Sequence, residues 1–156
     1  MRLQPSRVVE VLEKIVRTPI YSLVGVVGKD NLLVYSNEEG FSSLMIVDPS
    51  SGDRVRITRE PVLWVAEPPV GADRIVYTRD VSRGRELQRL FYYNLSRMVE
   101  EPLVAMEPIR VFGVADDGVN VAFTGATMED LAVYVVKRGS MEKVYKLPGL
   151  AIVSDV

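Results

Sequence analysis

The stretch GADRIVYTRDVSRGRELQRLFYYN, residues 71–94, contains two apolar runs that flank a charged turn. The direct interpretation is a β-hairpin. Its second run places Phe91 and Tyr93 on one face of the strand and Leu90 and Tyr92 on the other. A hairpin with one solvated face should alternate apolar and polar residues, so this strand requires a cover on both faces.

The composition is ordinary for a soluble globular protein with one core. The chain has 156 residues, of which 47% are apolar and 26% charged, and its net charge is −2. No apolar run approaches the roughly 20 residues of a membrane helix, and no signal peptide opens the chain. We therefore expect a cytoplasmic protein with no nucleic-acid and no membrane partner. The absence of cysteine and the abundance of valine favour a thermophilic source.

The chain contains neither histidine nor cysteine. A Ser-His-Asp or Cys-His catalytic arrangement is therefore impossible within it, and the commonest acid-base group at neutral pH is missing. A thiolate zinc site and a disulfide are excluded as well. We expect no catalytic residue, no metal and no cofactor in this chain.

One helix is expected, over residues 6–17. Val8, Leu12 and Ile15 recur there at helical spacing, while charged residues occupy the opposite face. Pro19 ends the segment. A helix this short is marginal alone, so its apolar stripe must dock on another surface.

From Tyr21 onward the sequence reads as strands and turns, in three groups of four strands with a period of roughly 40–47 residues. The second strands of the groups align as LLVYSN at 32, RIVYTR at 74 and NVAFTG at 120. The third strands align as LMIVDP at 44, LFYYNL at 90 and AVYVVK at 132. The segments that leave each group align as REP at 59, MEP at 106 and LPG at 147. This repeat is typical of β-propeller blades, which pack face to face and so cover their middle strands on both sides. A two-sheet sandwich would instead predict clean alternation in most strands.

The expected fold is therefore all-β with one N-terminal helix, a partial β-propeller of about three four-stranded blades and the start of a fourth. Because propellers close with roughly four to eight blades, the first and third blades should each present an apolar face, and self-association should follow. The candidate residues for these faces are Val24, Leu33 and Met45 on the first blade and Val121, Val133 and Val135 on the third.

The chain resembles the N-terminal part of archaeal acylaminoacyl peptidases, in the prolyl oligopeptidase family of serine hydrolases. The resemblance rests on YSLVGVV at 21, REP at 59, RIVYTRDVSRGRELQRLF at 74, VAFTGAT at 121 and LPGLAIVSDV at 147. Arg79, Asp80, Gly84 and Glu86 match a hairpin signature of that family's propellers.

This resemblance implies a seven-bladed propeller ahead of an α/β-hydrolase domain, with residues 1–19 docking on the hydrolase domain and residues 20–156 forming blades. The propeller would restrict the active site to short N-acylated peptides. The chain departs from the family because it has no G-x-S-x-G nucleophile elbow and no histidine. Two hypotheses follow: a gating segment whose missing blades and hydrolase domain lie elsewhere, or a free-standing module that completes its blades by self-association or partner binding.

Other features are interpreted as structural. Residues 116–118, Asp-Asp-Gly, are typical of a hairpin turn rather than a cation site. Trp64 is expected in an inner strand. Glu86 is expected to pair with Arg79 or Arg85.

Overall fold

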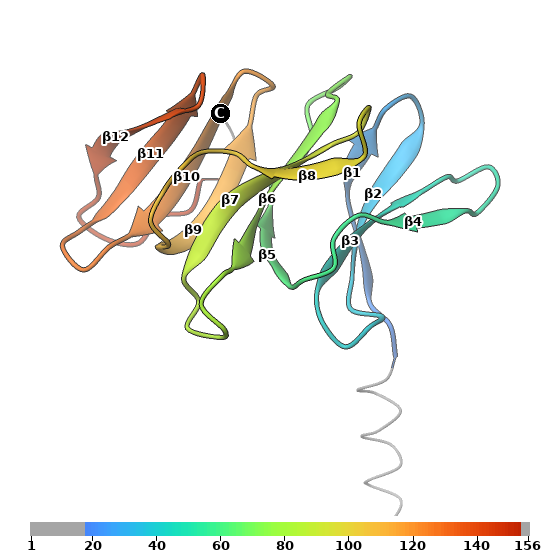
Figure 1. The fold of residues 1–156 in the computed structure, drawn as a ribbon, viewed down its shortest axis with the longest axis horizontal. Coiled ribbons are helices and arrows are strands. Elements are labelled where there is room, and N and C mark those ends of the chain that lie inside the picture. Colours follow the sequence, from blue (N-terminus) through green and yellow to red (C-terminus); the bar gives the residue numbers. More distant parts are fainter. Residues whose placement is uncertain (1–17, 154–156) are drawn as a thin grey trace, which may run out of the picture.

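The computed structural model describes residues 18–153, and all regular structure in this range is β-strand. Twelve strands form three four-stranded antiparallel sheets, as the sequence predicts (Figure 1). The helix expected over residues 6–17, with Val8, Leu12 and Ile15, lies outside the described residues. No helix within the described range is long and apolar enough to span a membrane.

Each sheet is one blade, and its strand order follows the chain. Blade one contains β1 (Tyr21–Val27), β2 (Asn31–Ser36), β3 (Ser43–Val47) and β4 (Arg54–Arg56). Blade two contains β5 (Val62–Val65), β6 (Arg74–Asp80), β7 (Gln88–Asn94) and β8 (Val99–Pro102). Blade three contains β9 (Arg110–Asp116), β10 (Asn120–Ala126), β11 (Leu131–Lys137) and β12 (Ser140–Lys146).

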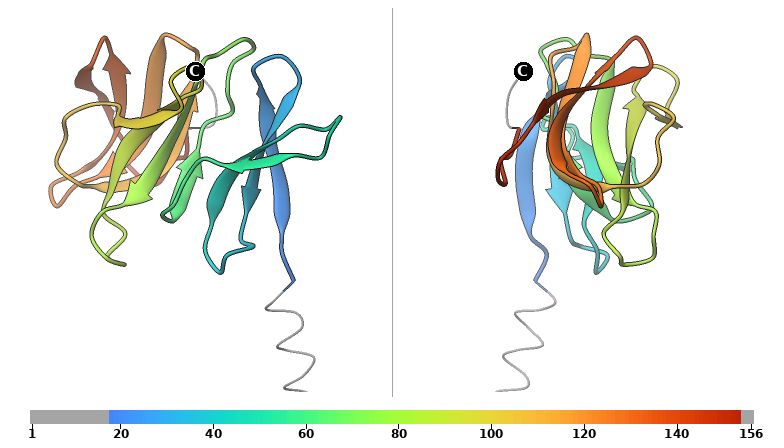
Figure 2. Two further views of the ribbon diagram at one scale, coloured as in Figure 1. Left: turned by 45° about the vertical axis from the view of Figure 1, so that its right-hand side comes forward. Right: turned by 90° about the vertical axis from the view of Figure 1, so that its left-hand side faces the viewer.

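Blade two lies between the other two blades, and its middle strands are covered on both sides (Figures 1 and 2). Phe91 and Tyr93 of β7 pack into a core shared with blade one, whereas Leu90 and Tyr92 pack into a core shared with blade three. The two-sided apolar pattern of residues 87–93 is thus explained by blade stacking.

The alignment of the second strand of blade one with that of blade two needs a correction. It matched Tyr35 with Tyr77, yet both side chains contribute to the same core between blades one and two. Equivalent residues of consecutive blades should all point toward the next blade or all toward the previous one. Tyr35 points toward blade two and Tyr77 toward blade one, so the two tyrosines are not equivalent. A shift of one residue along a strand turns every side chain to the other face, which explains the error.

The outer faces of blades one and three differ in part from the expectation. Leu33 and Val121 belong to the cores between blades, and Val24 packs against one of them, so their assignment to open faces is wrong. Val133 and Val135 lie opposite Thr124 and Ala122 on the outer face of blade three and are half-buried.

Met45 does lie on the outer face of blade one but is only 6% exposed. Tyr21 and Arg54, on the two edge strands of this face, meet across it. The Arg54 guanidinium lies 5.5 Å from the Tyr21 ring centroid and donates a hydrogen bond of 3.3 Å to the Tyr21 hydroxyl. Long side chains of the blade itself therefore cover part of its apolar surface.

A bidentate ion pair connects blades two and three at the rim that carries the β9–β10 turn. Arg74 Nε and Nη2 donate to Asp116 Oδ2 and Oδ1 at 3.0 and 2.6 Å, and the hydrogen bond to Asp116 raises the pKa of Arg74. The Asp116 side chain is 1% exposed. The adjoining Asp116-Asp117-Gly118 segment is a hairpin turn, as predicted, in which Asp117 Oδ1 accepts from the amides of Val119 and Asn120.

We predict that Arg74→Met lowers the free energy of unfolding by about 3 kcal/mol, because it leaves a buried carboxylate without its counter-ion. Arg89→Met, at an exposed position of β7, is the matched control and should change stability little. Adding Asp116→Asn to Arg74→Met should recover part of the loss in chemical denaturation. Equal stability of the Arg74 and Arg89 variants would contradict this role.

Candidate binding site at the rim of blades two and three

One rim of the blades carries the turns between the second and third strands. The chain enters blade one at this rim, where Ile20 N donates to Asn37 Oδ1 at 2.6 Å and Asn37 N donates to Ile20 O at 3.3 Å. Because each blade is an antiparallel meander, turns 37–42, 81–87 and 127–130 all lie at this edge (Figure 1). We refer to it as the entry rim.

The turn at 81–87 is folded by Asp80, at the end of β6. Its Oδ1 accepts from the amide of Ser82 at 2.7 Å, and its Oδ2 accepts from the amide of Gly84 at 2.6 Å. The Ser82 hydroxyl also donates a hydrogen bond to Asp80 Oδ1. This bond is the main cause of the lowered pKa of Asp80, and the amide bonds lower it further. Gly84 has a φ of 89°, which glycine adopts without steric cost. Glu86 adopts a φ of 61°, an uncommon value for a residue with a side chain.

Arg79, the residue before Asp80, holds the crossover between blades one and two. Its Nη1 lies 3.0 Å from Glu60 Oε2 and 3.1 Å from Glu100 Oε1, and its guanidinium lies 4.0 Å from the Phe91 ring centroid. Glu60 belongs to the REP segment, so the fold joins two segments that the sequence presented separately. The expected pairing of Glu86 with Arg79 or Arg85 is absent from the described ion pairs, and that expectation is wrong.

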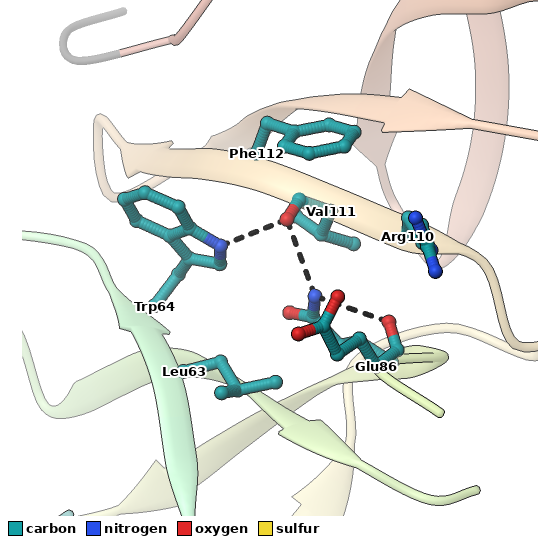
Figure 3. A pocket seen from close by; sticks show the side chains of 7 residues that line it. Leu63, Trp64, Glu86, Arg110, Val111 and Phe112 are labelled. Carbon is teal, nitrogen blue, oxygen red and sulfur yellow. Dashed lines mark hydrogen bonds between the residues drawn. The ribbon is translucent and has the colours of Figure 1, made fainter. Parts of the chain in front are cut away.

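A cleft of about 230 Å³ lies at the inner junction of blades two and three (Figure 3). Val111 O of β9 accepts from the Trp64 indole at 2.8 Å and from Gln88 Nε2 at 3.2 Å. Gln88 Oε1 in turn accepts from the Thr78 hydroxyl at 2.7 Å. Trp64 therefore lies in an inner strand, as predicted, but its half-buried ring also lines a cleft. The cleft is completed by Leu63, Glu86, Arg110 and Phe112.

A second cavity, the rim pocket, adjoins this cleft and shares Arg110 and Phe112 with it. Its volume is about 710 Å³. Six apolar residues line it: Leu87, Pro108, Ile109, Phe112, Ala126 and Met128. Four polar or charged residues complete the wall: Arg85, Glu107, Arg110 and Thr127. Within residues 18–153, no group of three or more acidic residues could hold a metal ion.

The hairpin signature contributes unequally to this rim. Asp80 folds the turn and Gly84 allows it to close. Glu86 lines the cleft between blades two and three, whereas Arg79 lines a separate cavity beside Glu60 and Glu100. Sequence reasoning did not single out Gln88, Arg110 or Phe112. One feature of the sequence could have indicated Gln88. It is a polar residue at the start of a strand that is apolar on both faces, and a polar side chain buried there needs hydrogen-bond partners.

Comparison with known proteins identifies one family and one fold. The family model described as the acylamino-acid-releasing enzyme-like N-terminal domain matches residues 12–156. The crystal structure of an oligogalacturonate lyase from Vibrio parahaemolyticus superposes with a TM-score of 0.57 at 11% sequence identity. The match covers 74% of this chain and 36% of the lyase chain, so the chain spans about a third of that structure. At this identity the likeness concerns the fold alone.

We predict that Asp80→Ala releases the 81–87 turn without unfolding the blades. The amide of Gly84 should lose hydrogen-exchange protection by about tenfold or more, because a charge-assisted bond is removed. In the wild-type chain this protection should be complete at neutral pH. It should fade as the pH falls through the lowered pKa of Asp80, since a depressed carboxyl pKa stabilises the fold above it.

Asp48→Ala is the matched control. Asp48 folds the 48–53 turn in a similar way, through the amides of Ser50 and Ser51. That variant should loosen its own turn and leave Gly84 protected. Unchanged protection of Gly84 in Asp80→Ala would show that the backbone alone folds the turn.

Proposed function

Because the chain belongs to the acylamino-acid-releasing enzyme-like N-terminal domain family, we propose that its three blades form part of a propeller that controls access to a serine-hydrolase active site carried outside these residues. The observation that carries the proposal is the joint match of family and architecture. The family model covers residues 12–156, and the described residues form three stacked four-stranded sheets. The absence of histidine from the sequence supports the assignment of catalysis to another part of the protein.

The proposed substrates are short N-acylated peptides. A ring of blades around an axis admits extended short peptides and rejects folded chains, which is a size filter. Exclusion of large polypeptides is a gating role and adds no chemical step. The blades therefore contribute selectivity, and the hydrolase domain contributes the nucleophile and the base.

The proposed partners are further blades and an α/β-hydrolase domain. The entry rim is proposed to face that domain, since residues 18–20 reach the blades at this rim and residues 6–17 are proposed to form the docking helix. Residues of this rim line both the cleft and the rim pocket, which supports its proposal as the functional side. The outer faces of blades one and three are proposed to contact the neighbouring blades of the ring.

The gating role is tested in the enzyme that contains both the blades and the hydrolase domain. An acetylated dipeptide should be cleaved, and an acetylated peptide of thirty or so residues should be rejected by a ring of this kind. Gln88→Ala removes a bond to Val111 O and should loosen the junction of blades two and three. We expect it to raise kcat/KM for the long peptide relative to the short one, whereas Ser50→Ala in an exposed turn should not. An unchanged length preference in Gln88→Ala, with the junction shown to be loosened by hydrogen exchange, would contradict the filter.

A second candidate is a free-standing module that completes its blades by self-association. The half-buried Val133 and Val135 on the outer face of blade three favour it, as does the 66% exposed Leu23 of blade one. Sedimentation of the chain at low micromolar concentration should then show species larger than 17.4 kDa. Val135→Glu should shift the distribution toward monomer, and Val119→Glu, in an exposed turn, should not. A soluble monomer with cooperative unfolding would exclude this candidate.

A further inference from the structure

Two arginines of the rim pocket have no acidic partner within the described part of the chain. Arg85 comes from the 81–87 turn and Arg110 from the start of β9, and both side chains are exposed. Four other described arginines, Arg56, Arg74, Arg79 and Arg97, form ion pairs. Arg85 and Arg110 thus bring two guanidinium groups without an ion pair to one cavity, which Glu107 also lines.

The cavity that both arginines line is mostly apolar and of ligand size. Ile109 and Phe112 of the β8–β9 region and Met128 of the 127–130 turn line it. Its volume of about 710 Å³ falls in the range of small-molecule and short-peptide sites. Met128 is fully exposed in this structure, so its side chain is free to close over an apolar group. The site therefore combines a hydrophobic floor with two guanidinium groups.

We propose that the rim pocket binds the C-terminal residue of a short peptide, with Arg85 and Arg110 on its carboxylate and the apolar floor under its side chain. This rests on the proposed function and names the part of the substrate that the blades recognise. An N-acylated peptide has no charged amino terminus, so its terminal carboxylate is the one charge that every such peptide carries. Guanidinium groups match a carboxylate in geometry and charge.

Glu107 gives the pocket a further selectivity. It lines the same wall as the two arginines, and a carboxylate there disfavours a second negative charge on the ligand. Peptides that end in Phe or Leu should therefore bind more tightly than peptides that end in Asp or Glu. A pocket built only to hold an apolar side chain of another protein domain would not distinguish an acid from an amide terminus.

The test uses this chain and two probes, N-acetyl-Ala-Phe and its C-terminal amide, titrated by calorimetry or by NMR. The acid should bind about tenfold more tightly than the amide, as expected for charge-assisted recognition. The double variant Arg85→Gln/Arg110→Gln should reduce acid binding to the level of the amide. Arg138→Gln, at the β11–β12 turn on the opposite rim, is the matched control and should retain the preference. Phe112→Ala should weaken both probes equally.

Each other outcome overturns the proposal. Equal binding of acid and amide would make the pocket an apolar socket, absence of binding would remove the site, and a preference that survives the double variant would place the carboxylate elsewhere. The fluorescence of Trp64, the single tryptophan of the chain, reports whether each variant keeps the blade two–three junction. None of these results bears on the length filter, which is measured by turnover of the complete enzyme.

Discussion

The burial of both faces of the middle blade is the constraint on which the rest of the structure depends. Ile75 and Tyr77 of β6 pack toward blade one, whereas Val76 packs toward blade three, and β7 repeats this division. A sheet buried on both faces cannot exist alone in water, because each face removes several large apolar side chains from solvent. The fold is therefore a stack, and each blade is stable only with its neighbours.

The stacking also determines where polar groups are placed. The inner strands bring backbone carbonyls to the junctions, and buried carbonyls need donors. Tyr35 supplies one to Val62 O at 2.7 Å, and Trp64 and Gln88 supply two to Val111 O. At each junction, side chains of one blade thus donate to a backbone carbonyl near the start of the first strand of the next blade, β5 or β9. The cleft beside Val111 is a consequence of this arrangement.

The candidate site was only partly accessible from the sequence. Local chemistry identified the 81–87 turn, since Asp80 and Gly84 act on residues within a few positions of themselves. The rim pocket was not accessible, because its wall combines residues 85, 87, 107–110, 112 and 126–128, which become neighbours only when blades two and three stack. Contacts between residues distant in sequence also explain why the expected ion pair between Glu86 and Arg79 does not form. Arg79 points back to Glu60 of the preceding crossover and across the sheet to Glu100 of β8, not forward into its own turn.

The sequence by itself determined the twelve strands, their grouping into fours and the need for covered faces, since alternation, turn residues and period are local properties of the chain. Only the tertiary structure decided which face of each strand meets which neighbour. Leu33 and Val121 entered the cores between blades, Met45 is buried although it lies on an outer face, and Tyr35 took the face opposite to its aligned partner. The physical reason is that a shift of a single residue inverts a strand, and this choice is made by packing between blades rather than within them.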